Sequence, residues 1–362
     1  MSHAPNTTSV PTASRLERLG FYTLAGHVES PRAMLDELRD AERLGLHTAF
    51  LSERFNVKEA ASLTGAAAAV TERLRIATAA TNHNTRHPAV TAAWATTLHR
   101  LTGGRFALGL GRGLRPQLDA FGLPPVTTAQ LEDFIGLMRR LWRGETVTDH
   151  DGPAGRYPQL KLDPNFNEQI PIGLTAFGPA TLALAGRAAD FVVLHTYFSD
   201  ETVRRCVAHV RQAAEQAGRD PESVQVWSCF ATVPDHLPEE EQLRRTAARL
   251  ATYLQVYGDL LVRTNDWDPA ALERFRADPV VAGLRGWADT VATPQEIEHI
   301  AEILPPEWLA SAATGSAERC ARSIRAQFDL GVDGVIMHCS TPAELEPVIH
   351  AYRKLIRTET TP

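Results

Sequence analysis

Five ionisable side chains follow the carboxyl ends of short apolar stretches that have the composition of buried strands. Histidine and glutamate can exchange protons near neutral pH, and arginine can stabilise a negatively charged oxygen. Any one of these residues could be a solvated loop residue or a helix cap, so it is their joint occurrence that indicates an active site. They are His27, Glu53, Arg54, His195 and His338.

Three further strand ends carry residues suited to binding an anion. The turn 109–113 reads GLGRG, which does not match Rossmann or Walker spacing, but Arg112 could form charge-assisted bonds to a phosphate there. Residues 82–87 read NHNTRH, and residues 177–181, FGPAT, begin a helix whose free amides could bind a phosphate or simply start the helix. No histidine and carboxylate pair has metal-ligand spacing, and no serine lies in a nucleophile elbow.

Strand and helix patterns alternate along the chain, which predicts a parallel sheet with right-handed crossovers. Eight such units favour an α/β fold of the (β/α)8 TIM-barrel type, with its active site at the carboxyl ends of the strands. A doubly wound open sheet is the alternative, but it would rarely need eight units. The predicted strands are 19–27, 47–55, 74–81, 105–110, 169–177, 190–195, 224–233 and 332–338, and the predicted helices are 31–45, 59–71, 87–102, 128–144, 178–188, 201–218, 316–331 and 344–356.

Two segments interrupt the alternation within a single predicted domain, residues 19–358. Residues 145–168 contain the turn sequence DGPAG, which predicts a small hairpin inserted on the barrel rim. Residues 235–315 are mostly helical in pattern and too long for a connection, so they form a second insertion that could shape a lid. Residues 1–18 are polar and predict a disordered amino-terminal arm.

Composition favours a small-molecule partner. The net charge of −6 and the pI near 6.1 argue against a nucleic-acid surface, which needs clustered cations. The start of the chain lacks the apolar core of a signal peptide, and no apolar stretch reaches the ~18 residues of a membrane span. The four scattered cysteines suggest neither a zinc site nor a disulfide framework, so we expect core thiols in a cytoplasmic protein.

The chain resembles the luciferase-like flavin or deazaflavin oxidoreductases, the bacterial luciferase superfamily, over about residues 18–355. Four motifs carry the resemblance: TNHNTRHPAV at 81–90, ALGLGRG at 107–113, GRYPQLKLDP at 155–164 followed by IPIGLTAFGP, and GVDGVIMH at 331–338. Within that superfamily, the chain is most similar to the actinobacterial branch expected to use coenzyme F420, an 8-hydroxy-5-deazaflavin.

The resemblance implies roles for individual residues. Ala79–Ala80 matches the family's non-prolyl cis peptide, which backs the ring of the cofactor, and Glu53 matches the acidic residue after the second strand. Arg54 stands where many relatives have a histidine, and Leu114 where many have an acid. The cofactor-binding residues predicted from the motifs and strand ends are Ala79, Ala80, Asn82, Arg86, Gly111, Arg112, Gly113, Ala176, Phe177 and Gly178.

The leading functional hypothesis is hydride transfer between the deazaflavin C5 and a small organic substrate, with the cofactor supplying the redox chemistry. Proton exchange would fall to Glu53, His27, His195 or His338, while Arg54 could stabilise an anionic ring or a substrate oxygen. Two alternatives stay open. One is an FMN-dependent monooxygenase that activates O₂, which oxygen uptake would distinguish, and the other is a non-catalytic flavin- or deazaflavin-binding barrel.

Two predicted helices, 59–71 and 87–102, are dense in alanine and threonine. Such small residues permit close packing between helices, and packing of both helices on their own barrel would be sufficient to explain them. The family resemblance favours a homodimer formed through this region.

Overall fold

In a computed structural model, which describes residues 16, 18–55 and 57–360, eight parallel strands close into a barrel. The strands pair in the order β12-β1-β2-β3-β5-β8-β9-β10, and β10 returns to pair with β12. The alternation of strand and helix patterns therefore predicted the correct fold, and the doubly wound sheet is excluded. The strands are β1 (Leu19–Thr23), β2 (Thr48–Leu51), β3 (Arg75–Thr78), β5 (Phe106–Gly111), β8 (Ile172–Ala176), β9 (Phe191–Leu194), β10 (Gln225–Pro234) and β12 (Gly334–His338).

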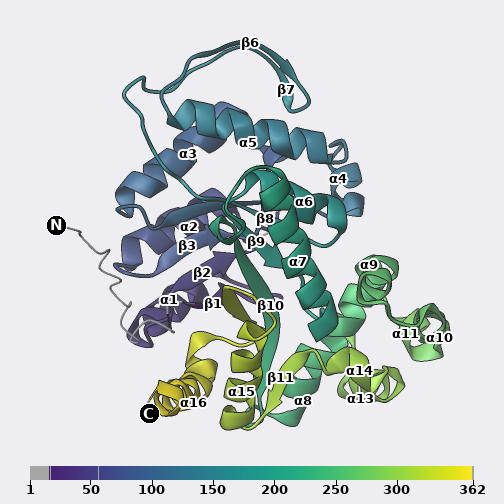
Figure 1. The fold of residues 1–362 in the computed structure, drawn as a ribbon. Coiled ribbons are helices and arrows are strands. Elements are labelled where there is room, and N and C mark those ends of the chain that lie inside the picture. The colour runs from purple at the N-terminus through teal and green to yellow at the C-terminus, as the bar shows by residue number, and fades with distance from the viewer. Residues whose placement is uncertain (1–15, 17, 56, 361–362) are drawn as a thin grey trace.

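A helix follows each barrel strand and covers the outside of the sheet (Figure 1). Because these helices bury one face only, their apolar residues recur at helical spacing, as in α5, where Leu131, Phe134, Ile135 and Met138 are buried. The helices are α1 (Met34–Arg43), α2 (Ala60–Val70), α3 (Pro88–Leu101), α5 (Thr128–Trp142), α6 (Pro179–Ala188), α7 (Asp200–Gln216), α15 (Ala317–Phe328) and α16 (Pro342–Thr360).

Among the predicted strands, 74–81 differs most from the structure, because the segment is not one continuous strand. It divides into β3 and a two-residue strand, β4 (Thr81–Asn82), which pairs with β5. The Ala79–Ala80 peptide between them is cis, as the family resemblance led us to expect. Short elements outside the expected pattern are η2 (Pro31–Ala33), η3 (His83–Thr85), α4 (Arg115–Ala120) and η4 (Pro221–Ser223).

The predicted hairpin is present as β6 (Val147–Gly152) and β7 (Gly155–Leu160). The hairpin lies beyond α5 in Figure 1. Its His150 contacts Asp133 of α5 at 3.0 Å, and its Tyr157 ring lies edge-on to His87 just before α3. The predicted disordered arm, 1–18, falls almost entirely outside the described residues.

The second insertion forms a helical lobe at one side of the barrel, at the lower right of Figure 1. Its last residues are not helical: β11 (Ala312–Gly315) extends the sheet by pairing with the end of β10. The other elements of the lobe are α8 (Glu239–Leu243), the π-helical turn η5 (Arg244–Ala248), α9 (Arg249–Asn265), α10 (Pro269–Ala277), α11 (Pro279–Gly283), α12 (Ala288–Val291), α13 (Pro294–Ile303) and α14 (Pro306–Leu309).

Large rings fill the interior of the barrel and lie over glycines of neighbouring strands. A Cβ added to Gly173 would lie 2.1 Å from the Phe191 ring, and one added to Gly334 would lie 2.4 Å from the Trp227 ring. The glycines therefore make room for the rings, which close the barrel as a packed core rather than a pore. This core supports the strand ends, where the predicted site residues lie.

Candidate active site

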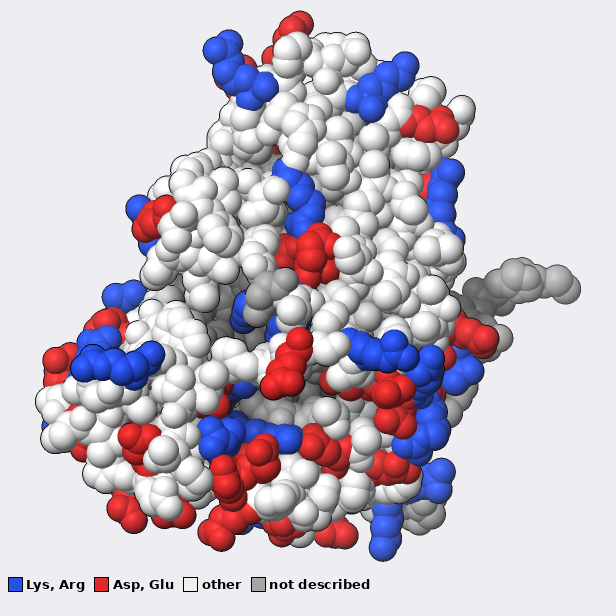
Figure 2. All heavy atoms as spheres, turned by 180° about the vertical axis from the view of Figure 1, so that it is seen from behind, with Lys and Arg blue, Asp and Glu red and all other residues white. Residues whose placement is uncertain are grey.

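The barrel brings the predicted site residues to one mouth. The Tyr22 hydroxyl donates to the Ala79 carbonyl at 3.0 Å, and the Tyr22 ring lies edge-on to His338, with centroids 5.3 Å apart. Across β8 and β9, the Phe177 and His195 rings are 4.4 Å apart. Figure 2 shows the molecule from behind. Its surface is hollowed where the helical lobe meets the body of the barrel, and charged side chains of both signs intermingle over the lower part of this face.

Two hydrogen bonds hold the cis peptide, and a glycine approaches it closely on a third side. The Glu53 amide donates to the Ala80 carbonyl at 3.1 Å, and Tyr22 holds the Ala79 carbonyl. On the third side, a Cβ added to Gly111 would lie 2.9 Å from the Ala80 Cβ, so glycine permits this close approach. Asn82 follows the bulge and donates from Nδ2 to the Gly111 carbonyl at 3.0 Å, which joins the predicted ring side to the glycine turn.

Glu53 and Arg86 form a buried ion pair. The Glu53 side chain is 1% exposed, and its oxygens accept from Arg86, from the Thr81 hydroxyl at 2.6 Å and from the Ala60 amide at 3.0 Å. Arg86 also bonds Glu59, whose carboxylate has its pKa lowered to about 2: burial opposes that shift, but bonds from backbone amides and Arg86 outweigh it. These contacts occupy Glu53 and balance the charge of Arg86, so the pair fixes the loop after β2 against the segment after β3.

Arg112 is a half-buried cation at this mouth, and among the described residues it pairs with no carboxylate. Its guanidinium donates to the Thr181 hydroxyl at 3.2 Å, the Val126 carbonyl at 2.7 Å and the Thr128 hydroxyl at 2.6 Å. Burial lowers the pKa of Arg112, yet the group remains cationic because its ordinary value is so high. Three of its five N–H donors are used in these bonds, which leaves the remaining donors and its charge available for an anion.

The segment Ala176–Gly178 leads from β8 into α6, beside Arg112. Gly178 is the residue before the first turn of α6, its added Cβ would meet nothing within 4 Å, and no side chain caps the helix. Open space in front of a helix amino terminus suits an anion, because the first amides and the helix dipole point there. Gly113 closes the other side of the turn at φ 73°, a conformation that favours glycine.

His195 lies within a cluster of aromatic rings. Its Nε2 is 2.7 Å from the Tyr257 hydroxyl, its Nδ1 is 2.7 Å from the Thr196 carbonyl, and the Tyr253 ring lies edge-on at 4.9 Å. Burial lowers the pKa of His195 to about 4, partly opposed by the bond to Thr196. The imidazole is therefore neutral at physiological pH.

His338 ends β12 and is 9% exposed. Its Nδ1 lies 2.9 Å from Cys339 Sγ, and its pKa is held well below the ordinary value by burial first and then by Arg249 and other cations. Arg54, by contrast, is exposed: it donates to the Ser52 hydroxyl at 2.7 Å and its electrostatic influence reaches Tyr22, Tyr253 and Tyr257. Among the described residues it has no carboxylate partner.

His27 connects the first barrel loop to the helical lobe. Its Nε2 lies 3.4 Å from Asp289, whose carboxylate also pairs with Arg249 at 2.6 Å. Asp289 is almost fully buried, and although burial opposes it, bonds from His27 and Thr252 and the charge of Arg249 lower its pKa. This contact joins the loop after β1 to α12 of the helical lobe.

Sequence reasoning missed five residues of this mouth. Tyr22 lies on β1, where successive side chains point to opposite faces of the sheet. The two-residue alternation of this strand could have shown that Tyr22 faces the inside of the barrel. The other four come from the helical insertion: Arg249, Tyr253 and Tyr257 of α9, and Asp289 of α12. The four-residue spacing of the first three is that of one helix face and could have grouped them, but it does not show that this face meets the barrel.

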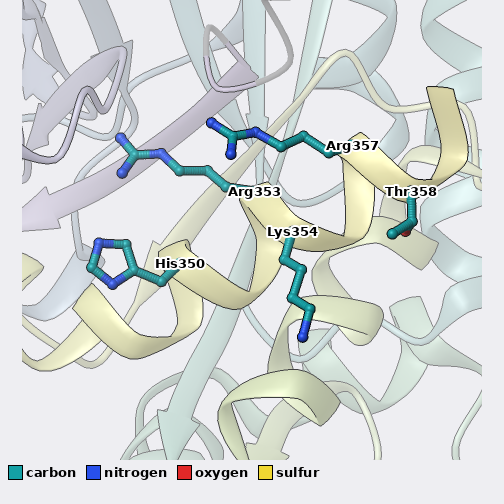
Figure 3. A pocket seen from close by; sticks show the side chains of 5 residues that line it. All are labelled: His350, Arg353, Lys354, Arg357 and Thr358. Atoms are coloured by element: carbon teal, nitrogen blue, oxygen red, sulfur yellow. The ribbon is translucent and has the colours of Figure 1, made fainter. Parts of the chain in front are cut away.

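A surface hollow of about 650 Å³ lies on α16, lined by His350, Arg353, Lys354, Arg357 and Thr358 (Figure 3). None of the predicted site residues lines it, so we assign it no part in the active site. No group of three or more metal-binding side chains occurs in the part of the chain that the structure describes. Within that same part, no helix is long and apolar enough to cross a membrane.

The fold is similar to that of several solved oxidoreductases. A coenzyme F420-dependent tetrahydromethanopterin reductase from Methanopyrus kandleri matches with a TM-score of 0.78 at 19% identity, covering 94% of this chain and 99% of that one. An F420-dependent secondary alcohol dehydrogenase matches at 0.69 and 17% identity, covering 92% and 97%. A monooxygenase from Streptomyces bottropensis matches at 0.66 and 18% identity, covering 95% and 100%. At these identities the likeness shows a luciferase-like TIM-barrel fold.

The sequence defines the family. The model of the luciferase-like monooxygenases matches residues 11–334, so the chain belongs to this family of flavin- and F420-dependent oxidoreductases. A 5,10-methylenetetrahydromethanopterin reductase of Methanolobus tindarius is 29% identical over 238 residues, which are 64% of this chain and 70% of that protein. A phthiodiolone/phenolphthiodiolone dimycocerosates ketoreductase of Mycobacterium tuberculosis is 35% identical over 158 residues, 42% of this chain and 41% of that protein.

Proposed function

We propose that this protein is a coenzyme F420-dependent oxidoreductase that transfers a hydride between the deazaflavin C5 and a small organic substrate. The observation that carries the proposal is the unpaired guanidinium of Arg112 beside the open amino terminus of α6. An anionic cofactor tail would pair with the guanidinium and accept hydrogen bonds from the free amides of the helix terminus. Two similar structures are F420-dependent enzymes, which favours the deazaflavin.

The residues present fit such a cofactor. Arg112 and the amides after Gly178 would hold the anionic tail, and Gly113 would allow close approach of the turn. Ala79, Ala80 and Gly111 offer a surface of small side chains on the ring side. When bound, the deazaflavin would supply a two-electron hydride exchange that no amino-acid side chain provides.

The protein would supply position and protons. Glu53 and Arg86 would fix the loop after β2 instead of exchanging protons, because their bonding groups are occupied by each other. Arg54 would place a positive charge near the substrate, and His27 would hold the lobe. Proton exchange would then fall to His195 or His338, which burial keeps neutral.

An FMN-dependent monooxygenase is the second candidate, since FMN also carries a phosphate and the monooxygenase of Streptomyces bottropensis has a similar fold. The two candidates differ in their reaction with oxygen. A deazaflavin has carbon in place of the flavin N5 and reacts poorly with O₂, so the monooxygenase would consume oxygen and the deazaflavin enzyme would not.

The test is a fluorescence titration of the purified protein with F420 and, separately, with FMN. We expect F420 to bind more tightly, and Arg112→Ala to weaken its binding roughly ten- to hundredfold through loss of charge-assisted hydrogen bonds. Arg115→Ala is the matched control, because Arg115 is an exposed arginine of the next helix that pairs with Asp119. Tighter binding of FMN would favour the monooxygenase, and binding of neither would favour a non-catalytic barrel.

A further inference from the structure

We propose that Tyr257 and His195 form a proton relay that accepts the hydroxyl proton of the substrate, so that the substrate class is an alcohol. This inference rests on the proposed function, because the hydride of that alcohol needs an acceptor. Tyr257 would contact the substrate, and His195 would act through Tyr257.

The hydrogen bonds of His195 determine which of its nitrogens carries the proton. A backbone carbonyl can only accept, so the 2.7 Å contact with the Thr196 oxygen requires a proton on Nδ1. In a neutral ring, Nε2 then has a lone pair, and the Tyr257 hydroxyl, also at 2.7 Å, must donate to it. The phenolic oxygen keeps its own lone pairs, which can accept a hydrogen bond from a substrate hydroxyl.

Burial keeps both members of the pair neutral. The pKa of His195 is lowered to about 4, and the pKa of Tyr257 is raised well above its ordinary value, by burial first and by Tyr253 next. A neutral imidazole whose Nε2 carries no proton can accept one through the Tyr257 hydroxyl, so the resting pair is in the protonation state that the relay needs. The charged and titratable groups around it are Tyr253 and Arg249 of α9, Arg54 after β2, Cys229 of β10 and His338 of β12.

The pair lies at the same mouth as the cis peptide. His195 follows β9, and it is near enough to His338 to help lower that residue's pKa, while Tyr22 bridges from the His338 ring to the Ala79 carbonyl. Tyr257 comes from the helical lobe, and α9 is kinked at this residue, with φ −150° and ψ 35°. The helix is therefore irregular at the residue that meets His195, and Tyr253 stacks against the Tyr257 ring at 5.6 Å.

The proposed step balances as an alcohol oxidation. The O–H bond of the substrate breaks and its proton passes to the Tyr257 oxygen, while the Tyr257 proton passes to His195 Nε2 and gives an imidazolium. The hydrogen on the carbinol carbon leaves as a hydride to an oxidised deazaflavin, the two-electron acceptor of the proposed function. The alcohol becomes a ketone or aldehyde, and the imidazolium later releases its proton to solvent.

The hydrogen-bond arrangement can be tested without cofactor or substrate, by NMR of protein labelled with ¹⁵N-histidine. His195→Gln assigns the resonances by removing them. We expect His195 to carry its proton on Nδ1 and to remain neutral down to about pH 5, and we expect Tyr257→Phe to shift the Nε2 resonance toward that of an unbonded lone pair. A proton on Nε2 in the unsubstituted protein would overturn the proposal, because His195 could then not accept the proton of Tyr257.

The catalytic role is tested with oxidised F420 and three probe alcohols, propan-2-ol, cyclohexanol and benzyl alcohol, followed by the loss of F420 absorbance. We expect Tyr257→Phe and His195→Gln to lower kcat roughly 10²- to 10⁴-fold, the range of general base catalysis. We also expect the acid limb of the pH profile, where His195 becomes protonated near its pKa of about 4, to disappear in His195→Gln. Tyr157→Phe, which removes a hydrogen-bonded hydroxyl from the distant hairpin, is the matched control and should keep both values.

The outcomes separate this proposal from the proposed function. Each variant is titrated with F420, and binding within roughly threefold of the unsubstituted protein shows that the cofactor site is intact. If F420 binds and an alcohol is oxidised, but both variants keep the kcat and the acid limb, the relay is refuted. If F420 binds and none of the alcohols is oxidised, the substrate class is refuted. If F420 does not bind, the proposed function fails, and the NMR result still decides the hydrogen-bond arrangement.

Discussion

Glu53 shows how burial changes the role of a residue that its type marks as catalytic. A carboxylate after the second strand could exchange protons, but this one is 1% exposed and both its oxygens accept hydrogen bonds. Arg86 is likewise enclosed, between Glu53, Glu59 and the face of Trp94. At the scale of single residues, the pair acts as a clamp between two loops.

Removing one member of the clamp should leave the other as a buried, unpaired charge. We predict that Arg86→Ala lowers the free energy of unfolding by about 3–5 kcal/mol, the typical effect of breaking a buried ion pair. The measurement is urea unfolding followed by tryptophan fluorescence and circular dichroism. Arg156→Ala, which removes an 82%-exposed arginine paired with Asp151 on the hairpin, should change the stability by at most about 1 kcal/mol. Equal losses in the two variants would contradict the clamp.

At the scale of elements, the barrel depends on strand glycines that accommodate interior rings. Gly173 of β8 lies under the Phe191 ring of β9, and Gly334 of β12 lies under the Trp227 ring of β10. The rings are enclosed by the other strands and have little room to move. The identity of these glycines is therefore a packing requirement, in contrast to Gly113, where a positive φ matters.

Gly173→Ala should destabilise the barrel, because its Cβ would overlap the Phe191 ring. We predict a loss of about 1–3 kcal/mol, as for other overpacked cores, and a lower midpoint of thermal unfolding. The matched control is Gly136→Ala on the exposed face of α5, where an added Cβ meets nothing within 4 Å. That change should stabilise the protein by roughly 0.5–1 kcal/mol, since alanine is the better helix former. An increase in stability for both variants would contradict the packing argument.

At the scale of the whole molecule, the outer surface of α3 carries exposed apolar side chains. Val90 is 56% exposed and Leu101 is 62% exposed, and both lie on α3, which packs beside α2. We propose that this surface forms a homodimer, which would remove these side chains from water.

The prediction is a dimer in light scattering after size exclusion, with twice the chain mass of 39.7 kDa. Leu101→Glu should shift the protein toward the mass of a single chain, because a charge would be buried in the contact. Val291→Glu, at a 46%-exposed position on α12 in the helical lobe, is the control and should leave the dimer intact. A single-chain mass for the unsubstituted protein would refute the dimer.

The sequence by itself determined the order of strands and helices, the barrel class, the cis position at Ala79–Ala80 and most of the strand-end residues. These follow from local patterns, since hydrophobic period, glycine and proline act within a few residues, and from motifs that the family shares. The division of the predicted strand 74–81 into two strands was not predicted, because the composition of this segment is that of one continuous buried strand.

The tertiary structure alone decided which of the strand-end groups are already bonded within the protein and which remain available to bind a ligand. Charge balance between Glu53, Arg86 and Glu59 depends on three separate segments, so no spacing along the chain could reveal it. The same holds for Tyr257, which reaches His195 from a helix 62 positions later in the chain. Contact between distant segments is set by how the lobe packs on the barrel. The four-residue spacing of Arg249, Tyr253 and Tyr257 groups them along α9, but it does not identify His195 as a partner.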